Sequence, residues 1–187
     1  MWMDISGTFD PWLFRNQSIY WSWHVFTLQK HTFTLSNMNI RSIPRNFQYF
    51  QDTIMHYFSI HIYVPWFTEV RLAPHLSSLY ELPMYHMYTN ARNVHGDGVA
   101  IYVSNEYNSS VLNQFTLSDS FIEFIGVEAT VLTRKYWLLC IYRPSSVNCN
   151  SFHNAVTDVL SSVYDKKYHG VFIWGNFNLN LLKNNEK

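Results

Sequence analysis

Apolar and polar residues alternate in short segments along most of this chain, a pattern typical of half-buried strands. The alternation is clearest over residues 33–40, FTLSNMNI, and short apolar or β-branched runs recur further along. The runs at 121–129 and 135–142 are separated by a turn near Thr133, so we expect them to pair. In all, the pattern predicts strands at residues 33–40, 60–67, 99–103, 121–129, 135–142 and 171–174.

Two other segments have apolar residues at the three- and four-residue spacing of a helix. These are residues 47–57 and, with the stronger stripe, residues 152–164, for which Ser151 is the expected N-cap. Residues 41–44, RSIP, are expected to end the first strand, and residues 72–81 are expected to form a loop with one helical turn. Strands interleaved with few helices favour an α/β architecture of mixed sheets with outer helices over a purely parallel, doubly wound sheet.

The composition fits one domain with a substantial core. The chain has 187 residues, and 48% of them are hydrophobic, which excludes a disordered polymer. Lys and Arg together number 13, as do Asp and Glu, so the chain has no net charge. Such a chain lacks the broad basic field of a tight nucleic-acid binder, although it remains compatible with a local basic patch. No apolar stretch approaches the roughly 18 residues that cross a bilayer, so no membrane partner is expected.

The cysteines and histidines do not indicate a metal centre. Cys140 and Cys149 have neither metal-ligand spacing nor a disulfide framework, and Cys140 lies in an apolar run typical of a core. A reducing, intracellular location follows as the expectation, in the nucleus or the cytoplasm. The nine histidines are scattered and lack HxxxH or HExxH spacing, so they do not predict a zinc site.

Residues 1–32 differ from the rest of the chain. They contain a group of aromatic residues without strand or helix periodicity: Trp2, Trp12, Phe14, Tyr20, Trp21, Trp23 and Phe26. We therefore divide the chain into an aromatic-rich N-terminal extension, 1–32, and a folded domain, 33–187. The extension is interpreted as an appended segment, and an aromatic platform for stacking nucleobases is the less favoured alternative.

Polar residues follow four of the predicted strands, and they could converge at one sheet edge. These residues are Asn39, Glu69, Tyr142 with Arg143, and Asn176 with Asn178. One carboxylate, several amides and a phenol around a cleft suit a hard cation such as Mg²⁺, which keeps several waters and takes one or two carboxylates. Such a cation polarises a phosphoryl oxygen, while amide and phenol donors hold the phosphate.

Five segments then resemble successive motifs of one family. They are MNIRS (38–42), FTE (67–69), GDGVAIYV (96–103), CIYRP (140–144) and WGNFN (174–178). In this order they resemble the endonuclease/exonuclease/phosphatase superfamily, most closely the endonuclease domain of non-LTR retrotransposon polyproteins. The resemblance implies a DNase I-like fold, a four-layer αββα sandwich of two mixed sheets, and DNA as the partner.

The resemblance also implies roles for single residues. Glu69 is the principal ligand of Mg²⁺ or Mn²⁺, and Asn39 contacts the phosphate or a metal-bound water. Tyr142 donates a hydrogen bond to the phosphate. Asn176 occupies the position of the aspartate that orients or activates the attacking water, and Asn178 that of the asparagine that helps to hold the phosphate.

Several positions depart from the family pattern. An amide at Asn176 can orient a water but cannot act as its general base, and this change lowers activity by on the order of 10²–10⁴. Arg71 follows Glu69 where the family has small polar and aromatic residues, and it could pair with Glu69 and compete with the metal. Asp97 interrupts a run of glycines. The chain ends nine residues after Asn178, so the family's last strands, with their catalytic histidine motif, are expected to be missing.

These observations leave three functions open. The first is a truncated phosphodiesterase-type domain of retrotransposon origin with weak or no activity and weak metal binding. The second is a non-enzymatic interaction module that associates through an open sheet edge, because missing strands would leave backbone groups unpaired. The third is an unselected transposon remnant.

Overall fold

The computed structural model describes most of the chain between residues 4 and 178. The described residues are 4–8, 20–28, 31–57, 64–91, 97–112, 122–164 and 166–178. Side chains are described from residue 35 onward, apart from those of residues 53–57. Neither α-helix in these ranges has the length and apolar composition needed to cross a bilayer.

Two mixed β-sheets form the centre of the molecule. The larger sheet has the strand order β1-β2-β3-β4-β6-β5, and only its β3–β4 pair is parallel. Its strands are β1 (Asp4–Thr8), β2 (Tyr20–Leu28), β3 (His31–Asn39), β4 (Val64–Thr68), β5 (Tyr85–Asn90) and β6 (Val99–Ser104). The smaller sheet has the order β10-β9-β8-β7, with β9 and β10 parallel. Its strands are β7 (Asn108–Val111), β8 (Glu123–Val131), β9 (Arg134–Tyr142) and β10 (Gly170–Asn176).

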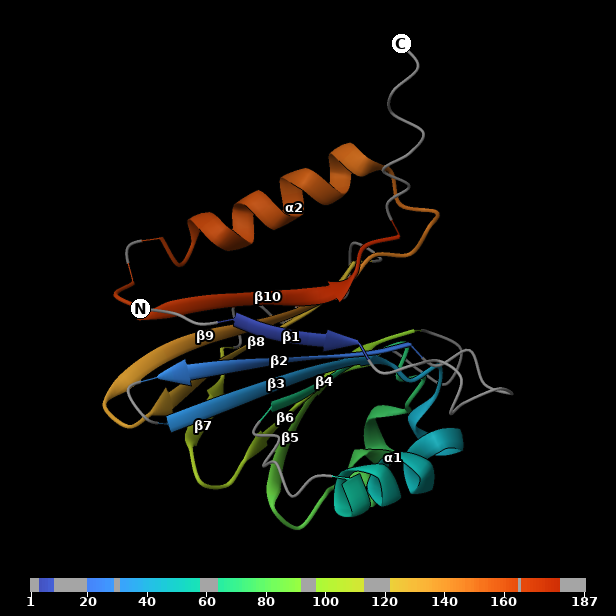
Figure 1. Cartoon of the computed structure of the whole chain (residues 1–187). Helices are drawn as coiled ribbons and strands as arrows, with labels where there is room; N and C mark the ends of the chain where they lie inside the picture. The colour runs from blue at the N-terminus through green and yellow to red at the C-terminus, as the bar shows by residue number, and fades with distance from the viewer. Residues whose placement is uncertain are drawn as a thin grey trace.

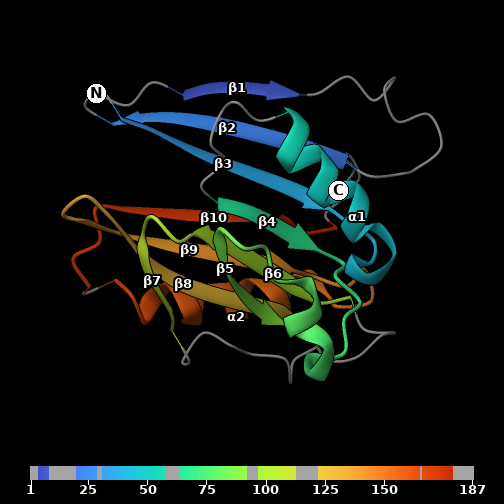
Figure 2. The same ribbon diagram turned by 90° about the horizontal axis from the view of Figure 1, so that it is seen from below.

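The sheets stack face to face, with helices on the two outer faces (Figure 1). Helix α2 (Cys149–Ser161) packs on the smaller sheet, whereas helix α1 (Ile43–Tyr57) and the 3₁₀-helix η2 (Pro74–Tyr80) pack on the larger one. Between the sheets lies a continuous apolar core to which Trp66, Ile101, Ile125 and Leu138 contribute. Figure 2 shows the same layers from below. The predicted αββα sandwich of two mixed sheets is therefore confirmed.

Most of the predicted elements are present, and their boundaries differ for local reasons. Strand β3 ends at Asn39, so the predicted end of the strand at residues 41–44 is confirmed. Pro44 lies in the first turn of α1, where the backbone N–H that proline lacks would have no partner. The N-cap of α2 is Asn148, whose Oδ1 accepts from the Ser151 N–H at 2.7 Å, so the prediction of Ser151 as the cap was wrong. The predicted helical turn at 72–81 is η2. Residues 60–63 of one predicted strand lie outside the described residues.

The aperiodic segment 1–32 contains two strands that the sequence pattern did not predict. Strand β2 pairs antiparallel with β3 over nine residues, from Tyr20 opposite Asn39 to Leu28 opposite His31. Strand β1 pairs in turn with β2, and both extend the larger sheet. Trp2, Trp12 and Phe14 lie outside the described residues, so the division at residue 32 and the proposed stacking role remain predictions.

Candidate active site

The polar residues that follow the strands meet at one end of the sandwich. Strand register sets this arrangement, since Asn39 lies opposite Thr68 on the parallel β3–β4 pair. In the other sheet Tyr142 lies between Asn176 of parallel β10 and Glu123 of antiparallel β8. The carboxyl ends of β3, β4, β9 and β10 therefore lie beside the amino ends of β6 and β8.

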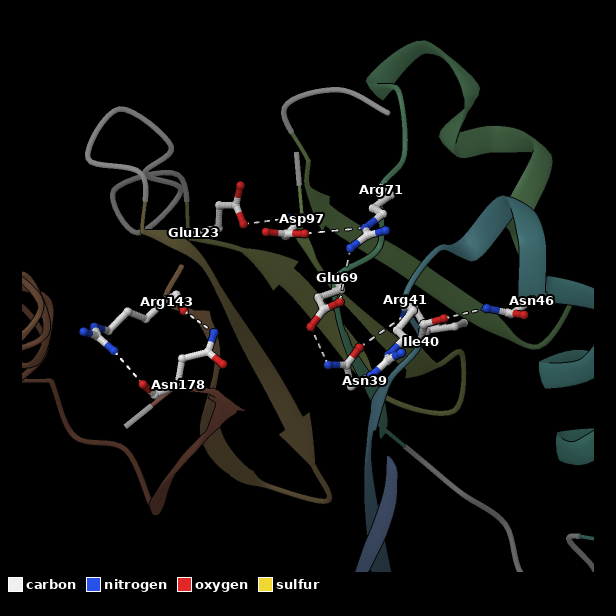
Figure 3. A network of polar contacts seen from close by, with 11 residues as sticks. Asn39, Ile40, Arg41, Asn46, Glu69, Arg71, Asp97, Glu123, Arg143 and Asn178 are labelled. Atoms are coloured by element: carbon white, nitrogen blue, oxygen red, sulfur yellow. Dashed lines mark hydrogen bonds and ion pairs between the residues drawn. The ribbon is translucent and has the colours of Figure 1, made fainter. Parts of the chain in front are cut away.

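Asn39 and Glu69 are in direct contact (Figure 3). The Asn39 Nδ2 donates to Oε1 of Glu69 at 2.5 Å, and the Asn39 Oδ1 accepts from the Arg41 N–H at 3.2 Å. Both ends of the amide are thus used, which fixes its orientation. Glu69 has a φ of 56°, a left-handed conformation that is uncommon for glutamate. Backbone strain of this kind concentrates at functional sites.

Arg71 connects Glu69 to a second carboxylate. Its Nη2 lies 3.5 Å from Oε2 of Glu69, and its Nε lies 3.5 Å from Oδ1 of Asp97. The backbone N–H of Arg71 also donates to the Asp97 carbonyl at 2.8 Å. The predicted pairing of Arg71 with Glu69 is confirmed, and Asp97 was not expected to take part.

Tyr142 comes from the opposite sheet and is directed toward the same carboxylates. The residue is 6% exposed. Burial raises the pKa of its phenol, and the pKa is raised further by a hydrogen bond to Asp97 and by the negative charges of Asp97, Glu69 and Glu123. The phenol therefore keeps its proton at neutral pH and can act as a hydrogen-bond donor.

The glycine turn before β6 links the two sheets. The Gly98 N–H donates to Oε2 of the fully buried Glu123 at 2.7 Å. Gly98 has a φ of 72°, and a Cβ at this position would lie 2.7 Å from Cγ2 of Val70. The left-handed residue of this turn is therefore Gly98, so Asp97 is free to place its carboxylate beside Arg71 and Tyr142.

Asn176 and Asn178 belong to a neighbouring network built on Arg143. The Asn176 Oδ1 accepts from the Asn178 N–H at 3.1 Å, and the Asn178 Nδ2 donates to the Arg143 carbonyl at 2.7 Å. The Arg143 guanidinium, in a residue only 5% exposed, donates to the carbonyls of Phe177 and Asn178, each at 2.9 Å, and to that of Val147. Arg143 thus ties the loop after β10 to the loop before α2 and fixes both asparagines.

The oxygen donors of the site are of the chemical type that a hard divalent cation prefers. Mg²⁺ commonly takes one or two carboxylates and keeps several waters, and Glu69, with a side chain 15% exposed, offers such a carboxylate. The Asn39 amide oxygen is directed to the Arg41 N–H. Within the described ranges, no group of three His, Cys, Asp or Glu residues is arranged to hold a metal. A cation would therefore depend on Glu69, water and a bound phosphate.

The sequence did not place Asp97 or Glu123 at this sheet edge, and it placed Arg143 there without predicting the contacts of its guanidinium. Glu123 carried one signal, because it is a lone carboxylate in the apolar run 121–127. A buried charge of this kind needs a partner. The partners of all three lie on other elements, and their contacts appear only in the folded chain.

No protein-family model and no curated protein matches this sequence. Solved structures do match its fold. The endonuclease domain of TRAS1, a telomere-specific non-LTR retrotransposon, matches with a TM-score of 0.57 at 12% identity, over 79% of this chain and 60% of that one. A humanized TDP2 from D. rerio matches with a TM-score of 0.57 at 14% identity, over 79% of this chain and 63% of that one.

An endonuclease/exonuclease/phosphatase family protein from Bacteroides thetaiotaomicron matches with a TM-score of 0.56 at 11% identity, over 81% of this chain and 66% of that one. The chain thus spans less than two thirds of the length of each of these structures. At such identities the similarity concerns the fold.

Proposed function

We propose that this chain, which has the DNase I-like fold of the endonuclease/exonuclease/phosphatase proteins, binds a phosphodiester at the end of its sandwich and hydrolyses it slowly. The observation that carries the proposal is the contact between Asn39 and Glu69 at 2.5 Å, beside a phenol from the opposite sheet. In this proposal, amide, carboxylate and phenol side chains from both sheets contact one bound phosphodiester. The proposed substrate is DNA, since the matched D. rerio TDP2 has also been solved with a single-strand DNA product.

Each residue has a proposed part in binding or in the chemistry. Glu69 would hold Mg²⁺ or Mn²⁺, and when bound such an ion supplies charge to a phosphoryl oxygen. The Tyr142 phenol donates a hydrogen bond to a second phosphoryl oxygen, which replaces Asp97 as its acceptor. Asn39 keeps Glu69 in place through its Nδ2, and Asn178 contributes a further donor at the edge of the site.

Asn176 explains why hydrolysis is expected to be slow. Its amide oxygen already accepts from the Asn178 N–H, and it can orient a water but has no basic oxygen that takes a proton. Binding and positioning remain, whereas proton abstraction from the attacking water is lost. The chain is therefore proposed to bind phosphodiesters better than it cleaves them.

Substitution of Tyr142 by Phe tests binding. The variant loses one donor to the phosphate, so its affinity for a fluorescein-labelled single-stranded oligonucleotide should fall about fivefold, in keeping with about 1 kcal/mol for a neutral hydrogen bond. Fluorescence anisotropy in Mg²⁺ measures the effect. Tyr164→Phe is the matched control, because Tyr164 is 88% exposed and follows α2. Equal affinities of native chain and Tyr142→Phe would contradict the proposed role.

A second function, self-association through a sheet edge, has one observation in its favour. Strand β10 is the terminal strand of the smaller sheet, and Val171 and Ile173 on it are 46% and 36% exposed. Uncharged, apolar edge strands favour pairing with another chain. In this alternative the fold is kept as an interaction module.

A further inference from the structure

We propose that Arg71 is a resident cation of this site and that its guanidinium competes with a divalent metal for Glu69. The inference rests on the proposed function, since it concerns the same carboxylate. It assigns to Arg71 control over metal occupancy. The site would thereby hold a positive charge of its own in the absence of metal.

The guanidinium lies between two carboxylates that would otherwise repel each other. It is 3.5 Å from an oxygen of Glu69 and 3.5 Å from an oxygen of Asp97. Two negative charges close to one position repel each other, and a cation between them reduces this repulsion. A divalent cation bound to Glu69 would play the same part. Arg71 and the metal thus satisfy the same electrostatic requirement.

The backbone holds Arg71 in this place. The Arg71 N–H donates to the Asp97 carbonyl at 2.8 Å, and the adjacent Val70 N–H donates to the Gly98 carbonyl at 3.4 Å. Arg71 also has a left-handed φ of 45°, which turns the chain back toward Glu69. The side chain is therefore directed to the carboxylates by the path of the loop after β4.

The competition is expected to be reversible. Contacts of 3.5 Å are longer than strong charge-assisted hydrogen bonds, and the Arg71 side chain is 44% exposed. A partly exposed guanidinium with long contacts can leave when a metal ion or a phosphate arrives. While it stays, its charge opposes the approach of a second cation to Glu69.

Removal of Arg71 should therefore increase metal affinity. We expect Arg71→Ala to bind Mn²⁺ about tenfold more tightly than the unsubstituted chain, a conservative value for a partly exposed charge. The free Mn²⁺ signal in electron paramagnetic resonance measures this without DNA. Arg71→Gln gives the same test if Arg71→Ala loses its fold. Glu69→Gln added to either variant should remove the gain.

Arg41→Ala is the matched control. Arg41 is exposed and lies near the same site, and its contact with Asn39 is made by the backbone N–H, which alanine keeps. The control removes the same charge and should change Mn²⁺ affinity less than twofold. Unchanged affinity in Arg71→Ala and Arg71→Gln, or an equal gain in Arg41→Ala, would overturn the proposal.

The outcome is separable from that of the proposed function. The Mn²⁺ measurement contains no oligonucleotide, so a negative result leaves phosphodiester binding through Tyr142 unaffected. Conversely, a chain that fails to bind oligonucleotides can still show the gain in Arg71→Ala. Each result then counts against one proposal only.

Discussion

The Asn176→Asp variant is expected to nick supercoiled plasmid DNA faster than the native chain by a factor on the order of 10²–10⁴ in Mg²⁺ or Mn²⁺, the usual size of a general-base effect. Aspartate has nearly the shape of asparagine and keeps the oxygen that accepts from the Asn178 N–H at 3.1 Å. The turn after β10 should therefore be preserved. What the substitution adds is a basic oxygen beside the position proposed for the attacking water.

Two controls make this result specific. Asn178→Asp introduces the same charge two residues away but removes the donor to the Arg143 carbonyl, so no gain in nicking is expected. Glu69→Gln in the Asn176→Asp background should abolish the gain, because the carboxylate proposed to hold the metal is lost. The proposal would be contradicted if Asn178→Asp gave an equal gain, or if Asn176→Asp were no faster than the native chain. Either result would show that the amide of Asn176 does not limit the rate of nicking.

Gly175→Ala is expected to destabilise the fold by about 3 kcal/mol or more, a large value for a single substitution. Gly175 has a φ of 153°, and a Cβ built there would lie 1.7 Å from the Ile141 carbonyl oxygen on the paired strand β9. The clash involves backbone in a buried strand, so no side-chain rotation relieves it. Because Asn176 follows directly, the glycine also sets where the site asparagines lie.

Urea denaturation followed by circular dichroism measures the loss in free energy of unfolding for Gly175→Ala. Gly170→Ala, in the same strand, is the matched control, because its Cβ would meet the Tyr136 ring at 3.2 Å, a contact that a small ring movement relieves. We expect the control to lose less than half as much free energy of unfolding. A Gly175→Ala variant as stable as Gly170→Ala would contradict this description of the β9–β10 pair.

Most of the strands predicted from the sequence are ones in which at least one face is buried, and β10, predicted from its apolar run, has only half-buried and exposed residues. Strands β6, β8 and β9 are almost entirely buried, and their apolar runs mark them clearly. Strands β5 and β7 were not predicted, because most of their residues are exposed or half-buried and polar residues interrupt their apolar positions. A strand of this kind, held mainly by backbone pairing, carries little strand pattern in its side chains.

In the candidate site, too, some features could be predicted from the sequence and others could not. Asn39, Glu69 and Tyr142 could be placed because each follows an apolar strand, and register brings such ends together. Arg143 was expected at the same edge, but its contacts could not be predicted, since most of its acceptors are backbone carbonyls, two of them 34 and 35 residues further along the chain. Every residue has a backbone carbonyl, so the sequence does not show which of them will accept from Arg143. The pairing of Arg71 with Asp97 likewise depends on how two loops meet.

The proposed function requires that the end of the sandwich near Asn39 and Glu69 binds a phosphodiester. Titration of the ¹⁵N-labelled 187-residue chain with a short single-stranded oligonucleotide in Mg²⁺, followed by two-dimensional NMR, tests this binding. We expect the perturbed backbone amides to cluster at this end, at Asn39, Glu69, Gly98, Tyr142 and Asn176. Perturbations confined to α2 and the exposed middle of β10, or no perturbation at all, would contradict it.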